Sequence, residues 1–175
     1  MGWCITCDGY SARGKRVVVV GNTNQAVIET LQLTRFTDKL TLLTDSHSLD
    51  IDAEHQVHLA RHAVPLVHDR IGRVEGTGGY VSAIETQGWQ RLDAERIFSE
   101  FGATPRTQLA SDLGVELTAL GYIVADSEQK TGTPGVFAAG DLTHLHGHQI
   151  ATAVHEGSQA ASAANSYLYA LDLRE

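Results

Sequence analysis

Four consecutive valines constrain the fold of this chain more than any other feature of its sequence. Val17, Val18, Val19 and Val20 form a continuous β-branched run that ends at Gly21. Such a run, bounded by turn residues, predicts a strand buried on both faces, as in a parallel sheet. The apolar spacing of residues 25–33 then predicts a helix, and residues 40–44 predict a second strand. This β-α-β unit of about 30 residues is the smallest piece of a Rossmann-type fold.

The rest of the chain alternates between helical and extended patterns. Short alternating segments between residues 70 and 102, separated by glycines, predict an antiparallel meander. The expected elements are, in order, a helix over 53–60, a strand over 64–67, meander strands over 71–75, 80–86 and 96–101, further strands over 122–125 and 135–139, and a helix over 149–171.

Composition excludes several classes of protein. A chain of 175 residues can bury about 70% of the surface that its unfolded form exposes, which is enough for a core. The chain carries 13 Lys and Arg against 21 Asp and Glu, a net charge of −8, so a nucleic acid or an anionic membrane surface is not expected as a partner. Because no apolar stretch approaches ~20 residues and no signal pattern begins the sequence, we expect a cytoplasmic protein.

The two cysteines, Cys4 and Cys7, stand in a C-x-x-C pattern near the start of the chain. One thiolate of such a pair can attack a substrate disulfide, and the second then resolves the mixed disulfide. A position at a helix start favours the thiolate, and the neighbouring Asp8 could move the proton. Half of a metal site or two incidental thiols are the alternatives. A C-x-x-C close to a β-α-β unit favours redox work.

Nine histidines also raise the question of a metal site. They include two groups, His55, His58 and His62 on one face of the predicted helix, and His144, His146 and His148 in a loop. Neither group has an evident carboxylate or thiol to complete a ligand set. We therefore interpret them as a solvated helix face and a polar loop, and expect no metal.

Four sequence blocks together resemble a known family. Residues 4–9, 14–21, 133–141 and 148–153 follow the order and spacing of low-molecular-weight thioredoxin reductases, and the resemblance covers nearly the whole chain. It implies an α/β protein with a Rossmann-like, three-layer NAD(P)-binding-like domain over residues 1–104, which carries the cysteines and an antiparallel β-meander. Residues 105–175 would form the C-terminal piece of a second, discontinuous FAD-binding α/β domain. The N-terminal FAD-binding part has no counterpart, so we expect a truncated, split or processed chain that alone binds FAD weakly.

The resemblance also implies roles for the cysteine motif. Cys7 would face the flavin, Cys4 would exchange with the protein substrate, and Asp8 would act as acid and base. Electrons would pass through FAD to the Cys4/Cys7 disulfide and on to a thioredoxin-like protein. The family commonly forms homodimers, so a homodimer is expected.

Two adjacent stretches are implied to bind FAD. Gly140 and Asp141 correspond to the residues that hold the ribityl-phosphate region. His148, Gln149 and Ile150 would open the final helix near the isoalloxazine, where the N-terminal helix dipole favours negative charge. His148 stands where the family usually has Arg, which makes the charge at this position dependent on pH.

The pyridine nucleotide motifs match less well. A dinucleotide turn requires the pattern G-x-G-x-x-G/A. The turn here keeps the first glycine, Gly21, and the final alanine, but it has Thr23 in place of the second glycine, and Asn24 follows. The basic stretch with which the reductases bind the 2′-phosphate of NADPH is replaced by residues 44–47, which include Asp45. Asp45 would repel that phosphate but could bind the ribose of NADH.

Several functions therefore stay open at this stage. NADH or NADPH could be used weakly, or electrons could come from another donor such as ferredoxin. A different class of function is a non-catalytic nucleotide-binding or redox-sensing interaction module that keeps the dithiol.

Overall fold

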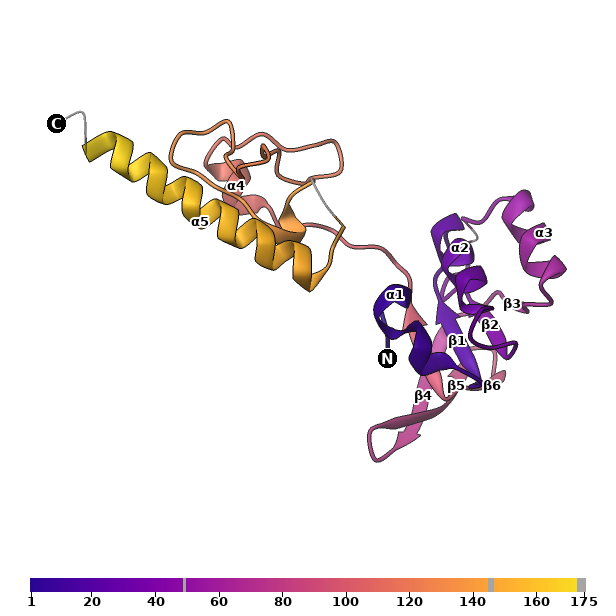
Figure 1. Ribbon diagram of the computed structural model, residues 1–175. Coiled ribbons are helices and arrows are strands. Elements are labelled where there is room, and N and C mark those ends of the chain that lie inside the picture. Colours follow the sequence, from indigo (N-terminus) through magenta and orange to yellow (C-terminus); the bar gives the residue numbers. More distant parts are fainter. Residues whose placement is uncertain (49, 145–146, 173–175) are drawn as a thin grey trace. The chain divides into compact units, whose positions relative to one another are not determined.

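The chain forms two compact units, Met1–Gly102 and Ala103–Glu175 (Figure 1). The computed structural model describes residues 1–48, 50–144 and 147–172, with residues 171 and 172 described by their backbone alone. Of the helices described, none has the length and apolar character needed to span a bilayer.

A four-stranded parallel sheet organises the first unit. Its order is β3-β2-β1-β7, with bounds Leu66–Val67, Leu40–Leu43, Val17–Val20 and Arg96–Ser99. The four valines of β1 pair in parallel with β2 on one edge and with β7 on the other. Helix α2 (Asn24–Leu33) connects β1 to β2, and α3 (Ala53–Arg61) connects β2 to β3. The predicted β-α-β unit is confirmed.

Alternate valines of β1 face opposite sides of the sheet. Val17 and Val19 pack in one core cluster with residues of α2 and α3. Val18 and Val20 pack in a second cluster with Ile84 and other residues of an antiparallel meander. The meander has the order β4-β5-β6, with bounds Ile71–Thr77, Tyr80–Thr86 and Arg91–Asp93. Helices on one face and a meander on the other give the three layers that the sequence predicted (Figure 1).

The prediction that residues 96–101 form a meander strand is wrong. Residues 96–99 form β7, which joins the parallel sheet beside β1, and β6 is the third meander strand. β7 is buried on both faces, so its two buried apolar residues are adjacent rather than alternating. Ile97 packs with the meander cluster and Phe98 with the helix cluster.

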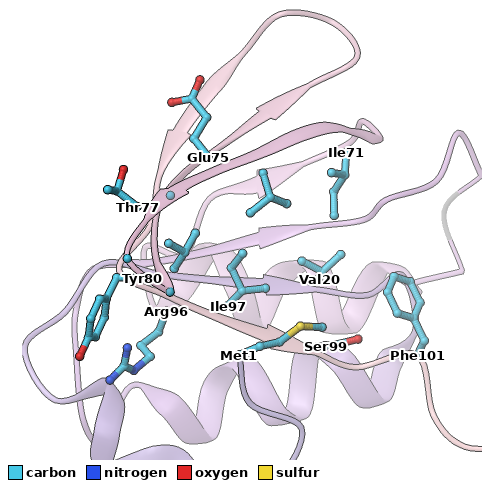
Figure 2. Close-up of a pocket in the computed structure, with 15 residues that line it drawn as sticks. Met1, Val20, Ile71, Glu75, Thr77, Tyr80, Arg96, Ile97, Ser99 and Phe101 are labelled. Carbon is cyan, nitrogen blue, oxygen red and sulfur yellow. The ribbon is translucent and has the colours of Figure 1, made fainter.

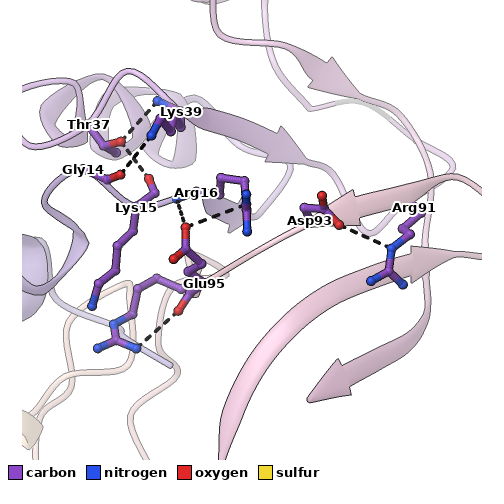
Figure 3. A network of polar contacts seen from close by, with 9 residues as sticks. Gly14, Lys15, Arg16, Thr37, Lys39, Arg91, Asp93 and Glu95 are labelled. Carbon is purple, nitrogen blue, oxygen red and sulfur yellow. Dashed lines mark hydrogen bonds and ion pairs between the residues drawn. The ribbon is translucent and has the colours of Figure 1, made fainter. Parts of the chain in front are cut away.

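Polar contacts close the edge of the sheet at which β1 begins (Figure 3). The Thr37 hydroxyl donates to the Lys15 carbonyl at 2.7 Å, and Lys39 Nζ donates to the Gly14 carbonyl at 3.3 Å. The Arg16 amide donates to Glu95 Oε2 at 3.0 Å, and this hydrogen bond is the main cause of the lowered pKa of Glu95. These contacts join the segments that lead into β1, β2 and β7.

The second unit contains less regular structure. Its elements are α4 (Gln108–Asp112), a short 3-10 helix η2 (Gly140–Leu142) and the long helix α5 (Ile150–Asp172). The predicted C-terminal helix is confirmed. The predicted strands over 122–125 and 135–139 are wrong, because these segments make only isolated bridges, at Ile123, Ala125 and Phe137. Their apolar residues are instead buried in a small cluster with α4.

Candidate redox and nucleotide sites

The cysteine motif forms a single helical turn at the start of the first unit. Cys4 is the N-cap of α1 (Ile5–Asp8), with an extended backbone, and its sulfur accepts a hydrogen bond from the Cys7 amide at 3.2 Å. The two sulfurs lie 2.6 Å apart. Cys4 is half-buried and Cys7 is exposed. The geometry therefore suits a dithiol that can open and close within one turn of chain.

Backbone contacts fix this turn to the sheet. Gly2 pairs in parallel with Phe98 of β7, with hydrogen bonds of 2.8 Å from the Gly2 amide to the Ile97 carbonyl and 3.1 Å from the Ser99 amide to the Gly2 carbonyl. At the other end of the motif, Gly9 has no room for a side chain, because a Cβ would lie 2.9 Å from the ring of Phe36. The dithiol is thus held on a rigid support.

Asp8 adjoins the dithiol as the sequence predicted. Its amide donates to the Cys4 carbonyl at 2.8 Å, so the residue belongs to the same turn. The carboxyl group is half-buried. Its proposed part in proton transfer is not tested by these contacts and stays a prediction.

The predicted nucleotide turn follows β1 directly. A Cβ on Gly21 would lie 2.5 Å from the Glu100 carbonyl oxygen and 2.8 Å from the Ala26 Cβ, so glycine is required by close packing. Thr23 is the N-cap of α2, and its hydroxyl accepts the Ala26 amide at 3.3 Å. A helix start binds phosphate through such amides. Here Thr23 itself occupies one of them.

Asn24 further closes this turn. Its amide nitrogen donates to Asp52 Oδ2 at 2.8 Å, and its amide oxygen accepts the Asp52 backbone amide at 3.0 Å. The neighbouring Asp50 pairs with Thr23 through a parallel bridge. Two acidic residues therefore lie against the turn, and the clasp between Asn24 and Asp52 is a feature that the sequence analysis missed.

Asp45 lies two residues after β2, at the same edge of the sheet as the Gly21 turn. Its φ of 51° is left-handed, and its Oδ1 accepts the Ile71 amide at 2.7 Å. The carboxylate thus anchors the start of β4. The structure brings the predicted residues Gly21, Thr23 and Asn24 together in one turn. Asp45 lies at the same edge, but its carboxylate already accepts the Ile71 amide.

A second carboxyl group missed by the sequence analysis is Glu100, directly after β7. The residue is 8% exposed, and its Oε1 has no hydrogen-bond partner among the described residues. Burial, a hydrogen bond to Glu29, the charge on Glu29 and the thiolate charge of Cys4 together raise the pKa of Glu100 to about 8. A glutamate at the end of a buried strand is the signal that could have revealed it.

In the second unit, a buried glutamate holds the Gly140–Asp141 turn. Glu156 is 2% exposed, and its Oε2 accepts the Gly140 amide at 2.6 Å and the Thr143 hydroxyl at 3.1 Å. Gly140 has a φ of 77°, a conformation that favours glycine. Asp141 is exposed. The sequence missed Glu156, although it is the one acidic residue between positions 150 and 171.

The residues predicted to lie near the isoalloxazine are exposed at the start of α5. The Gln149 amide donates to the Gly147 carbonyl at 2.8 Å, and the ring of His148 lies 5.4 Å from that of Tyr122. Ile150 is 86% exposed. All three predicted residues are therefore accessible to solvent at this helix start.

The histidine groups give no metal site in the part of the chain that is described. His55 does have a carboxylate beside it, since its Nδ1 lies 2.7 Å from Asp52 Oδ1, which the sequence analysis did not foresee. No group of three or more His, Cys, Asp or Glu is placed to hold a metal ion within these described residues. His146 lies outside them.

A cavity of about 530 Å³ lies between the β4–β5 hairpin and the sheet (Figure 2). Val20 and Ile97 form part of its apolar lining, and Arg96 and Tyr80 lie at one end. No motif of the sequence assigns this cavity a ligand.

The comparisons with known proteins agree with this architecture. The model of the pyridine nucleotide-disulphide oxidoreductase family matches residues 4–159. Thioredoxin reductase of Treponema pallidum is 33% identical over 172 residues, which are 95% of this chain and 55% of the relative. A component of the alkyl hydroperoxide reductase of Pseudomonas putida is 34% identical over 175 residues, covering 95% of this chain and 33% of that protein.

Solved structures show the same relationship. Thioredoxin reductase of Streptococcus pyogenes superposes with a TM-score of 0.83 at 28% identity, over 96% of this chain and 57% of that chain. The atypical thioredoxin reductase TRi of Desulfovibrio vulgaris Hildenborough has a TM-score of 0.58 at 34% identity, over 96% of this chain and 56% of that chain.

A dithiol on a Rossmann-like sheet, followed by a separate second unit, is expected of the class of flavin-dependent disulfide oxidoreductases. The chain belongs to the pyridine nucleotide-disulphide oxidoreductase family, and thioredoxin reductases are among its homologues. It spans about half the length of the thioredoxin reductases that it matches.

The family typically uses FAD and NAD(P)H, and the two candidate turns differ in how well they suit these cofactors. The Gly140 turn fits a flavin cofactor, because the buried Glu156 holds the turn in place and the exposed Asp141 carboxylate stays available to accept hydrogen bonds from a ligand. The Gly21 turn does not fit a dinucleotide pyrophosphate as it stands, because Thr23 occupies the Ala26 amide.

Proposed function

We propose that the chain is the dithiol-bearing part of a thioredoxin reductase-like, FAD-dependent disulfide oxidoreductase that acts on a thioredoxin-like protein. The single observation that carries this proposal is the pair of sulfurs 2.6 Å apart in the anchored α1 turn. The family match over residues 4–159 supports it. When bound, FAD would supply the two electrons that reduce the Cys4–Cys7 disulfide.

The two cysteines have separate roles in this proposal. The Cys4 thiolate attacks one sulfur of the substrate disulfide, forms a mixed disulfide and releases the other sulfur as a thiolate. Cys7 then attacks Cys4, which forms the Cys4–Cys7 disulfide and releases the second substrate sulfur. The substrate gains two electrons and the dithiol loses two. Asp8 lies in the same turn and would move a proton, and Cys7 would be the cysteine that faces the flavin.

We assign the domains on the same basis. Residues 1–104 would be the NAD(P)-binding-like domain, and residues 105–175 the C-terminal part of the FAD-binding domain, with Gly140, Asp141 and residues 148–150 toward the flavin. Large apolar side chains on α5 support this, since Ile150, Val154 and Tyr169 are each more than half exposed. Such a surface is expected where a further layer packs. The half of the thioredoxin reductases that this chain does not match would supply that layer, and a homodimer in the cytoplasm is the expected setting.

A second candidate concerns the electron donor. The Thr23 cap, the Asn24–Asp52 clasp and the engaged Asp45 all disfavour NADPH at the Gly21 turn. A donor other than a pyridine nucleotide, such as ferredoxin, is therefore favoured, with weak use of NADH as the alternative. Asp45 predicts that NADH binds at least as tightly as NADPH.

The test is to purify the intact gene product with and without added FAD, record its visible spectrum and count the thiols formed on anaerobic reduction. We expect a flavin band and two new thiols per chain from the oxidised protein. A Cys4→Ser variant should keep the flavin band and lose turnover of a thioredoxin-like disulfide. A protein that shows no flavin band even with added FAD contradicts the proposal and favours a non-catalytic module. Parallel runs with NADH, NADPH and reduced ferredoxin identify the donor.

A further inference from the structure

The position of Glu100 beside the dithiol has a chemical consequence. Gly2 and Phe98 are paired in parallel, and the two segments continue by two residues to Cys4 and Glu100 respectively. The Cys4 backbone is extended there, with φ −134° and ψ 112°. Cys4 and Glu100 therefore occupy matching positions on the two adjacent segments, and the charge of the Cys4 thiolate contributes to the raised pKa of Glu100.

The surroundings of Glu100 favour its neutral form. Glu100 is 8% exposed, and the Oε1 atom is buried without a hydrogen-bond partner in the described part of the chain. The titratable groups that act on its carboxyl are Glu29 from α2 and Cys4 from the segment before α1. Both carry negative charge when ionised. Glu29 is itself held in place, because its Oε1 accepts a hydrogen bond from Gln25 at 2.9 Å.

We propose that Glu100 is a positioning residue that holds a proton beside Cys4, and that loss of this proton suppresses formation of the Cys4 thiolate. The two groups share one electrostatic environment, so each negative charge opposes the other. With its pKa raised to about 8, Glu100 is neutral at pH 7 and leaves Cys4 able to ionise. Above pH 8 its carboxylate faces the thiolate and opposes it.

This inference deepens the proposed function, because it assumes that Cys4 is the exchanging thiol. Its test needs no flavin, so the two proposals can fail separately. The measurement is the rate of Cys4 alkylation by iodoacetamide in the full chain carrying Cys7→Ser, followed by mass spectrometry from pH 6.5 to 9.5. The same series is run with Glu100→Gln added.

At pH 6.5 we expect equal rates with and without Glu100→Gln, since Glu100 is then neutral. Near pH 8.5 the Glu100→Gln chain should react about two- to fivefold faster, because a glutamine cannot ionise. The proposal is overturned if the ratio of the Cys4 alkylation rates with and without Glu100→Gln stays constant across the pH range, whether that ratio equals 1 or differs from 1.

Further variants locate the effect. Glu29→Gln removes a neighbouring charge, so Glu100 should ionise at a lower pH, and near pH 7.5 Cys4 should react more slowly in this variant than in the parent. The comparison needs only the parent and a substitution at a half-exposed helix position, so it keeps the proposal testable if Glu100→Gln does not fold, and equal rates at every pH contradict the proposal. Glu54→Gln, on exposed α3, makes the same chemical change elsewhere and should follow the parent. In a Cys4→Ser background the Cys7 rate should respond less to Glu100→Gln than the Cys4 rate does, and an equal response there contradicts the proposal.

Discussion

The turn at Gly21 and the turn at Gly140 each combine a glycine, a nearby helix and a supporting side chain, yet the supporting side chains bind different groups. At Gly21, Thr23 caps the start of α2 and Asn24 binds Asp52, so the polar groups that would bind a ligand are already engaged. At Gly140, the buried Glu156 accepts the turn amide, and the Asp141 side chain stays exposed and available to a ligand.

The two buried glutamates differ in the same way. Glu156 meets two donors, the Gly140 amide and the Thr143 hydroxyl. Glu100 meets two acids, Glu29 and Cys4, and its pKa rises to about 8. A buried carboxyl surrounded by donors is a structural support, whereas one surrounded by acids stores a proton. The comparison explains why similar burial leads to different proposed roles.

The largest effect is expected from Glu156→Ala. This change removes the buried acceptor of the Gly140 amide, while the Thr143 hydroxyl keeps the Gly140 carbonyl at 3.0 Å, and it should cost the second unit about 3 kcal/mol. The measurement is hydrogen exchange of peptides covering residues 135–144, with denaturant unfolding beside it. Protection in these peptides should fall sharply.

His155→Ala is the matched control, because His155 is an exposed neighbour on the same turn of α5. It should leave exchange at residues 135–144 unchanged. Equal protection in Glu156→Ala and in the parent would show that the Gly140 turn does not depend on the buried Glu156 carboxylate.

The second effect compares the two turn glycines directly. Gly21→Ala places a Cβ 2.5 Å from the Glu100 carbonyl oxygen, so it should destabilise the first unit by about 2 kcal/mol through overpacking. In Gly140→Ala the new Cβ makes only an ordinary 3.5 Å contact with Ala153, and the φ of 77° should cost about 1 kcal/mol. Unfolding midpoints of the two variants test the order, and a larger loss for Gly140→Ala would reverse this account.

The sequence predicted the parts of the fold that local pattern determines. The β1 valines, the α2 periodicity and the Ala-rich α5 were identified correctly, because each carries a strong periodic signal of its own. Residues 96–101 were misassigned because the segment was interpreted as alternating, whereas the adjacent apolar residues Ile97 and Phe98 are typical of a strand buried on both faces. The segments 122–125 and 135–139 are apolar enough for strands, but each makes only isolated bridges.

The site was predictable where chemistry lies in adjacent residues. Cys4, Cys7 and Asp8 fall in one turn, so their spacing revealed the dithiol. Glu100 and Glu156 stand out in the sequence only as acidic residues in apolar surroundings, and their roles depend on burial and on partners distant in the sequence. The Asn24–Asp52 clasp joins residues 28 apart for the same reason. Pairing over such separations is a property of the tertiary structure.

The third prediction concerns a substitution that frees the Ala26 amide at the Gly21 turn. Thr23→Gly removes the hydroxyl that accepts the Ala26 amide, at a cost in stability of a few tenths of a kcal/mol. The released amide should then bind a pyrophosphate oxygen, and affinity for NADH should rise about fivefold, the equivalent of about one hydrogen bond. Calorimetric titration measures this. Thr34→Gly, at the other end of α2, is the control, and unchanged NADH affinity in Thr23→Gly would show that the cap does not close the turn.

The smallest effect is expected on lowering the pH, and it tests the second contact that closes the Gly21 turn, the Asn24–Asp52 clasp. Hydrogen bonds from the backbone and side chain of His55 lower the pKa of Asp52, which also binds Asn24. A carboxyl whose pKa is lowered by folding stabilises the folded state above its unfolded pKa, and this contribution is lost as the pH falls through the lowered folded value. Below about pH 4 the N-terminal turn of α3 should therefore lose protection from hydrogen exchange. Asp52→Asn should show less protection there at pH 7 and a weaker dependence on acid. If parent and variant lose protection in parallel, the ionised Asp52 does not hold the clasp, and the closure of the Gly21 turn then depends on Thr23 alone.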